Sequence, residues 1–68
     1  MNYLQKKVLE YQQKKLEQAE NMLQSHITQK EQLKENGSDK EIENEDKMIK
    51  IWIINVEKIK QEINKLQK

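Results

Sequence analysis

The residues that could do chemistry are few, and the sequence does not group them as a catalytic or metal site requires. His26 is the only histidine, and the chain has no cysteine. No second histidine, Glu-x-x-His pair or Ser-His-Asp set accompanies His26, so neither a nucleophilic triad nor a metal site is indicated. A chain of 68 residues also has little bulk from which to form a substrate cleft. We therefore predict a protein that is not an enzyme and that binds no cofactor or metal.

Lysines gather near the two ends of the chain. They are Lys6, Lys7, Lys14, Lys15, Lys58, Lys60 and Lys65. They could bind an anionic partner such as RNA, DNA or an acidic protein. However, the net charge is only +1 and all 13 basic residues are lysine, whereas arginine is the usual bidentate partner of guanine and phosphate. Glutamates also interrupt the lysines, so a nucleic-acid partner is not favoured.

The strongest candidate for a functional surface is the apolar segment 48–56 (MIKIWIINV), which holds the only tryptophan. Tryptophan is enriched among the residues that dominate binding energy at interfaces, although the same ring could pack inside the fold against Leu23. The segment is predicted to be helical, because its apolar residues recur with a period of about 3.5 and the chain offers no second strand to pair with it. The candidate interface residues are Met22, Met48, Ile51, Trp52 and Ile54.

Long helices must position these residues, since the chain contains no proline and a single glycine. At about 100° per residue, the apolar residues of 2–35 fall on one face, which predicts an amphipathic helix. A turn over 36–38 and a second helix over 39–67 complete the chain. The prediction is one all-α domain over residues 1–68, an antiparallel two-helix hairpin resembling a coiled coil.

The predicted turn has its own sequence signals. Gly37 is the only glycine, and glycine commonly ends a helix in the left-handed conformation. Ser38 and Glu41 have the spacing of a capping box, which begins a helix. One helix is therefore expected to stop, and the next to start, within about three residues, and a connection this short makes the helices antiparallel neighbours.

Two heptad patterns, found separately, come into register when the chain folds at this turn. The first helix has Leu9, Leu16, Leu23 and Lys30 at a, with Gln12, Ala19, His26 and Leu33 at d; the second has Ile42, Ile49, Val56 and Ile63 at a, with Glu45, Trp52, Ile59 and Leu66 at d. In this register Lys30 faces Glu45 as a polar layer that sets the alignment. His26 faces Ile49, either as a space-filling boundary histidine or as a pH-sensitive layer.

Apolar residues outside this seam indicate that the hairpin does not function as an isolated monomer. They are Leu4, Val8, Tyr11 and Met22 in the first helix and Met48, Ile51, Ile53 and Ile54 in the second. Most of them share one side of the hairpin, and an exposed apolar patch of this kind usually marks an interface. Since one seam hardly offsets the entropy of ordering so short a chain, we expect the hairpin to dimerise into a four-helix bundle.

The distribution of charge favours a head-to-tail dimer. Residues 1–19 and 55–68 carry eight lysines and four glutamates, a net charge of +4, whereas residues 20–54 carry five lysines and eight acidic residues, a net charge of −3. Opposite ends of two hairpins therefore attract one another, although salt screens the effect.

The expected dimer of hairpins resembles in architecture the Rop family of plasmid RNA-binding proteins. The resemblance covers shape alone, and shape implies no function. The segment 61–64, Gln-Glu-Ile-Asn, is similar to the Ser-Gln-Glu-Leu-Asp motif of small helical-hairpin phosphatases that act on sporulation response regulators. Lys60 stands where that family has serine, and Asn64 where it has aspartate, so the phosphatase function is not carried over.

The function predicted from these features is that of a small interaction protein. The leading hypothesis is a regulator or inhibitor that binds itself and a second cytoplasmic protein through an apolar helical face. A nucleic-acid-binding hairpin dimer and a purely structural oligomeric scaffold are the alternatives. The N-terminus has no apolar signal core, and the longest apolar run is far too short to span a bilayer, so we expect a cytoplasmic location and no membrane partner. The bias toward Lys, Ile, Asn and Gln suggests a bacterial or phage coding sequence.

Overall fold

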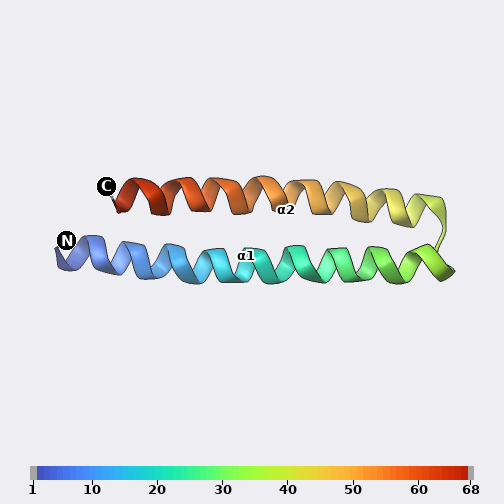
Figure 1. The fold of residues 1–68 in the computed structure, drawn as a ribbon, viewed down its shortest axis with the longest axis horizontal. Helices are drawn as coiled ribbons and strands as arrows, with labels where there is room; N and C mark the ends of the chain where they lie inside the picture. The colour runs from blue at the N-terminus through green and yellow to red at the C-terminus, as the bar shows by residue number, and fades with distance from the viewer. Residues whose placement is uncertain (1, 68) are drawn as a thin grey trace.

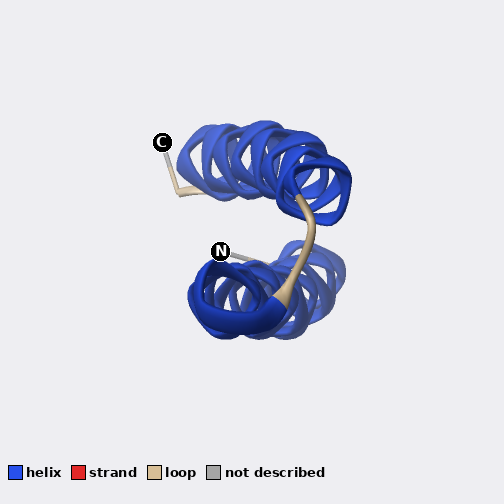
Figure 2. Ribbon diagram, turned by 90° about the vertical axis from the view of Figure 1, so that its right-hand side faces the viewer, coloured by secondary structure: helices blue, strands red, loops and turns tan. Residues whose placement is uncertain are grey.

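The computed structural model describes residues 2–67 as two long helices joined by a tight turn. Helix α1 spans Tyr3–Asn36 and α2 spans Asp39–Leu66. They run antiparallel along a rod of 51 × 14 × 11 Å, so that the start of α1 and the end of α2 lie together at what we call the open end, opposite the loop end (Figure 1). Seen end-on, the helices form a single layer (Figure 2). The predicted all-α antiparallel hairpin is confirmed.

Both helices begin with a capping box. The Ser38 hydroxyl accepts a hydrogen bond from the backbone N–H of Glu41 at 3.2 Å, and the Glu41 carboxylate accepts one from the backbone N–H of Ser38, as predicted. Asn2 and Gln5 make the same reciprocal pair at the start of α1. This second box was not anticipated, although its Asn-x-x-Gln signal is present in the sequence.

Gly37 ends α1 in a different way from the prediction. Its φ of −97° and ψ of 168° are extended and not left-handed, and its N–H donates to the carbonyl of Leu33 at 2.6 Å. A Cβ at position 37 would lie 2.6 Å from Leu33 Cδ2 and 2.8 Å from the Leu33 carbonyl oxygen. Glycine is therefore favoured by its close approach to the last turn of α1, and not by a backbone conformation that other residues avoid.

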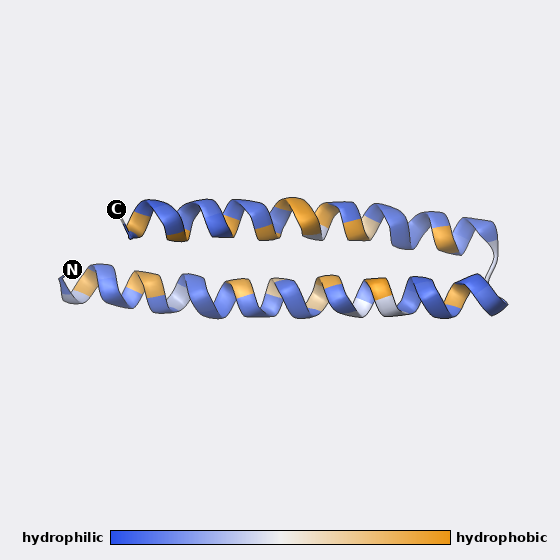
Figure 3. Cartoon of the chain, viewed as in Figure 1, coloured by the Kyte–Doolittle hydropathy of each residue, from blue (hydrophilic) through white to orange (hydrophobic). Residues whose placement is uncertain are grey.

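The seam between the helices is centred on Ala19 of α1 and on Val56 and Ile59 of α2, which are buried. Partly buried around them lie Leu16, Leu23, Trp52 and Ile63. Every a and d position of the two predicted heptads is buried or half-buried, while most other positions are exposed. Figure 3 shows the same pattern as apolar residues on the facing sides of the helices. The predicted seam is thus confirmed.

Toward the loop end, the helices are joined by two polar pairs that differ from the predicted polar layer. Glu45 Oε2 lies 2.7 Å from His26 Nδ1, and Lys30 Nζ lies 2.5 Å from Asp46 Oδ1. The prediction of a Lys30–Glu45 pair was wrong, and His26, expected to face Ile49, has a carboxylate partner. Glu45 reaches along the seam toward the open end, which leaves the neighbouring Asp46 to pair with the lysine.

The core is thin for a chain of this length. Three apolar residues are buried, and within residues 2–67 no side chain is fully buried. Among residues 2–67, nine large apolar side chains are exposed, which is three times the number that are buried. Small domains bury a low fraction of their surface and usually gain stability from staples or from association. The exposed apolar surface is therefore the feature of this fold that a function must explain.

Candidate protein-interaction surface

Exposed apolar residues of α2 form a strip along one side of the helix. Met48, Ile51 and Ile54 follow one another at intervals of three residues and are 37%, 50% and 53% exposed. Trp52 adjoins them and is partly buried against the core. Residues three and four apart are neighbours on a helix surface. These four residues are therefore continuous, and we call them the α2 strip.

The segment of α2 that carries the strip is apolar on all sides. Ile49 is half-buried in the seam, while Ile51, Ile53 and Ile54 are all exposed. At about 100° per residue, Ile53 lies on the flank opposite Ile51. Figure 3 shows the result as an apolar band across the middle of α2. A helix that is apolar all round is normally enclosed by other protein, so this segment is underpacked in a single hairpin.

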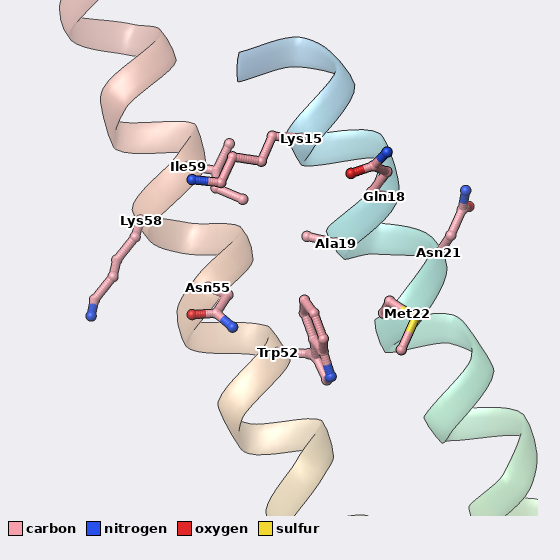
Figure 4. Close-up of a pocket in the computed structure, with 9 residues that line it drawn as sticks. All are labelled: Lys15, Gln18, Ala19, Asn21, Met22, Trp52, Asn55, Lys58 and Ile59. Atoms are coloured by element: carbon pink, nitrogen blue, oxygen red, sulfur yellow. The ribbon is translucent and has the colours of Figure 1, made fainter. Parts of the chain in front are cut away.

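Trp52 lies between the two helices (Figure 4). Its ring packs against the buried cluster of Ala19, Val56 and Ile59. Its Nε1 atom is buried and donates no hydrogen bond to any residue of 2–67. A buried donor without an acceptor costs about 1–3 kcal/mol. Within residues 2–67, no group therefore supplies an acceptor for this indole N–H.

A groove of about 760 Å³ opens beside Trp52. Ala19 and Ile59, both buried, lie at its base, and Figure 4 shows Ala19 and Met22 of α1 on the side facing Trp52 of α2. The remaining lining residues are Lys15, Gln18, Asn21, Asn55 and Lys58. This groove, which we call the Trp52 groove, was not predicted. The signal that could have revealed it is Ala19, the smallest residue of the seam, close to the largest.

The structure divides the five predicted interface residues between two adjacent surfaces. Met22 and Trp52 come from different helices and meet at the Trp52 groove. Met48, Ile51 and Ile54 do not line the groove and continue outward over α2 as the strip. Because Trp52 belongs to both, the groove and the strip form one surface that wraps from the seam onto the back of α2.

Other exposed apolar side chains lie near the open end. They are Tyr3, Leu4, Val8 and Tyr11 of α1. The Lys7 amino group stands over the Tyr3 ring, 5.5 Å from its centroid. The polar residues Lys15, Gln18 and Asn55 separate this region from the α2 strip. The second apolar face that the sequence predicted is therefore interrupted near its middle.

All seven lysines of the predicted anionic-partner patch are exposed. Lys7 pairs with Glu10 at 3.6 Å and Lys65 with Glu62 at 3.5 Å, each within one helix. Among residues 2–67, five of the seven make no ion pair, and these are Lys6, Lys14, Lys15, Lys58 and Lys60. Two of these five line the Trp52 groove. The predicted patch therefore includes two lysines that line the groove and five that do not.

The His26–Glu45 pair brings together an imidazole and a carboxylate, two groups that also occur in catalytic sites. Its side chains are 15% and 19% exposed and lie apart from the lining of the Trp52 groove. Within the described part of the chain, no group of three His, Asp or Glu side chains is placed to hold a metal ion. Over the same residues, neither helix has an apolar stretch long enough to cross a bilayer. The main candidate for a functional surface is therefore the exposed, apolar α2 strip together with the adjoining Trp52 groove.

Comparisons with known proteins identify no relative from which a function could be inferred. No family model, no curated protein and no solved structure matches the chain. What the hairpin does must accordingly be argued from which side chains it exposes and what would cover them.

Proposed function

We propose that this hairpin is a small protein-binding module, a regulator or inhibitor without catalytic activity, whose contact surface is the α2 strip together with Met22. The observation that supports it most is the exposure of Met48, Ile51 and Ile54 on a helical segment that is apolar on all sides. Exposed apolar patches of this kind mark interaction sites in proteins that are otherwise highly charged. The chain fits that description, with charged residues making up 37%.

The free energy available from covering this surface is large for so small a protein. Fully burying an isoleucine or methionine side chain contributes about 1.5–3 kcal/mol, so covering one that is already half-buried contributes about 1 kcal/mol. Met22, Met48, Ile51 and Ile54 together would then contribute on the order of 4 kcal/mol. That is comparable with the whole stability of a small domain, so association through this surface also stabilises the fold.

The substitution Ile51→Glu tests the proposal. It places a charge in the middle of the α2 strip, where any partner would have to desolvate it. Because Ile51 is half exposed, the hairpin itself should keep its helicity. We expect association to be lost, with sedimentation equilibrium reporting self-association and a pull-down reporting binding to another protein, while far-UV circular dichroism changes little.

Gln61→Glu is the matched control, because it adds the same charge at an exposed position of α2 outside the strip. This variant should associate like the wild type. If Ile51→Glu leaves both the sedimentation mass and the binding of partners unchanged, the α2 strip is not a contact surface and the proposal fails.

Self-association into a four-helix bundle is the second function that an observation favours. The open end carries a net charge of +4 and the rest of the hairpin −3, so two copies attract when their ends are opposed. A purely structural role would then suffice to explain the exposed isoleucines. Sedimentation equilibrium across a range of ionic strengths tests this proposal, since a head-to-tail bundle held partly by charge should dissociate more readily as salt rises.

A further inference from the structure

The Trp52 groove has a charge of one sign. Lys15 lines it from α1 and Lys58 from α2, and no acidic residue is part of its lining. Neither lysine makes an ion pair with any residue of 2–67. In the view of Figure 4, Lys15 extends from α1 toward α2 beside Ile59, whereas the amino group of Lys58 points away from α1, on the outer side of α2. The groove therefore combines an apolar base with two cationic side chains that have no partner in the hairpin.

The shape of the groove favours a helix as its occupant. It lies between two antiparallel helices, with Ala19 as a small residue at its base and with the larger Met22 and Trp52 beside it. Its volume of about 760 Å³ accommodates several apolar side chains. A third helix packed lengthwise against α1 and α2 would bring such side chains at successive turns, as amphipathic helices do when they bind apolar grooves.

A second copy of this chain that meets the groove with its own groove is a poor occupant. In a symmetric dimer with its two-fold axis through the groove, the same surface of each copy meets itself. Lys15 and Lys58 of one hairpin would then approach the same lysines of the other, and like charges brought together in this way are unfavourable. Contact between two copies of the groove is therefore unfavourable, and the charge of the groove favours a different, acidic protein. A head-to-tail second copy, whose residues 20–54 carry a net charge of −3, is the competing occupant.

We propose that the Trp52 groove binds an amphipathic helix of a different protein, whose apolar residues cover Ala19 and Trp52 and whose acidic residues pair with Lys15 and Lys58. The inference rests on the proposed protein-binding function and specifies the partner of that surface. Acidic residues would have to flank the apolar face of that helix on both sides, because one lysine comes from each wall of the groove. These are the e and g positions of a heptad whose a and d residues are apolar.

Two synthetic peptides and the tryptophan of the full-length chain provide the test. Both peptides have three heptads with leucine at a and d and no tryptophan; one carries glutamate at e and g, and the other carries lysine. Trp52 is the only tryptophan and lines the groove, so its fluorescence reports occupancy. At low ionic strength we expect the glutamate peptide to bind with a Kd about tenfold lower than that of the lysine peptide, given two ion pairs of up to about 1 kcal/mol each.

Charge reversal in the groove should reverse this preference. The double variant Lys15→Glu/Lys58→Glu is expected to bind the lysine peptide more tightly than the glutamate peptide. Lys6→Glu/Lys60→Glu changes the net charge equally, at exposed lysines outside the groove, and should keep the wild-type preference. If circular dichroism shows that the first variant has lost helicity, Lys15→Gln/Lys58→Gln takes its place and should bind both peptides equally.

Three results would overturn the inference: neither peptide alters Trp52 fluorescence, both bind equally to the wild type, or the Lys6→Glu/Lys60→Glu control loses the preference as fully as the groove variant does. None of them bears on the proposed protein-binding function, which depends on the Ile51→Glu experiment. If Ile51→Glu abolishes association while the peptides show no charge preference, the surface binds a partner but not an acidic helix in this groove.

Discussion

The seam between α1 and α2 changes character along its length. Around the middle of the hairpin it is apolar, with Ala19, Val56 and Ile59 buried and with Trp52 among the residues packed around them. Toward the loop end it is crossed by the His26–Glu45 and Lys30–Asp46 pairs. The two parts are made by the same two helices with the same heptad spacing, so they differ only in which side chains occupy equivalent positions.

We infer that the two parts of the seam have different roles, one in the stability of the hairpin and the other in the alignment of its helices. Burying apolar area contributes most of the free energy of folding, but layers of leucine and isoleucine tolerate a shift by one heptad because each such layer resembles the next. A pair of hydrogen-bonding side chains does not tolerate such a shift, since it leaves both polar groups without partners in apolar surroundings. The middle of the seam therefore holds the helices together, while the polar pairs near the loop favour one register.

The largest effect is expected from breaking the apolar middle of the seam. Val56→Asp places a carboxylate among buried apolar residues, which costs several kcal/mol in a core that has only three buried members. We expect most of the helical signal in far-UV circular dichroism to be lost at a fixed protein concentration. Ile53→Asp makes the same kind of change three residues away, at a half-exposed position outside the α2 strip, and should keep the signal. Equal helicity in the two variants would contradict this account of the core.

A smaller effect is expected from the His26–Glu45 pair. The two side chains lie 2.7 Å apart and are mostly buried, so removing either one leaves the other without its partner. His26→Ala and Glu45→Ala should each lower the free energy of unfolding by about 1–2 kcal/mol, and the double variant should lose less than the sum. Urea denaturation of the wild type, the two single variants and the double variant gives the coupling free energy of the pair. Additive losses of stability would show that the two side chains do not interact in solution.

Replacing both His26 and Glu45 by leucine tests whether the pair selects the alignment of the helices. Buried polar pairs exchanged for apolar residues often leave stability unchanged or raised. If the pair selects the register, the His26→Leu/Glu45→Leu protein should instead lose uniqueness, visible as additional amide peaks in a ¹H–¹⁵N correlation spectrum. A single set of peaks in that protein would remove the role in alignment that we assign to the pair.

The apolar part of the seam was predictable from the sequence because it depends on periodicity alone. Every a and d position of both heptads is at least half-buried, and a spacing rule is enough to find such positions. The start of α2 was predictable for a similar reason, since Ser38 and Glu41 signal it locally. These features follow from neighbours in the chain and need no knowledge of side-chain conformation.

The His26–Glu45 and Lys30–Asp46 pairs and the groove were not predictable in this way. Glu45 and Asp46 are adjacent in sequence, and which of them meets His26 or Lys30 depends on side-chain rotamers that the spacing does not determine. The Trp52 groove arises because Ala19 is small where its partners across the seam are large, which is a matter of relative volume. The extended conformation of Gly37 depends likewise on its contact with Leu33. Each of these features is set by packing across or beyond the helix.

The smallest effect in this comparison is a pH dependence at Lys30–Asp46. Lys30 donates a hydrogen bond to Asp46 and holds the pKa of that carboxyl below its ordinary value of 3.8. Because the pKa is lower in the folded protein, the pair stabilises the fold above the ordinary pKa, and its contribution is lost as the pH falls through the folded value. Asp46→Asn should therefore be slightly less stable than the wild type near neutral pH, and the gap in urea midpoint should close as the protein is acidified toward about pH 2. Lys30→Gln removes the side chain that lowers the pKa of Asp46. In a protein carrying Lys30→Gln, the Asp46→Asn substitution should therefore change the urea midpoint less than it does in the wild type. A gap that persists at low pH would mean that asparagine is unfavourable at position 46 for a reason unrelated to charge.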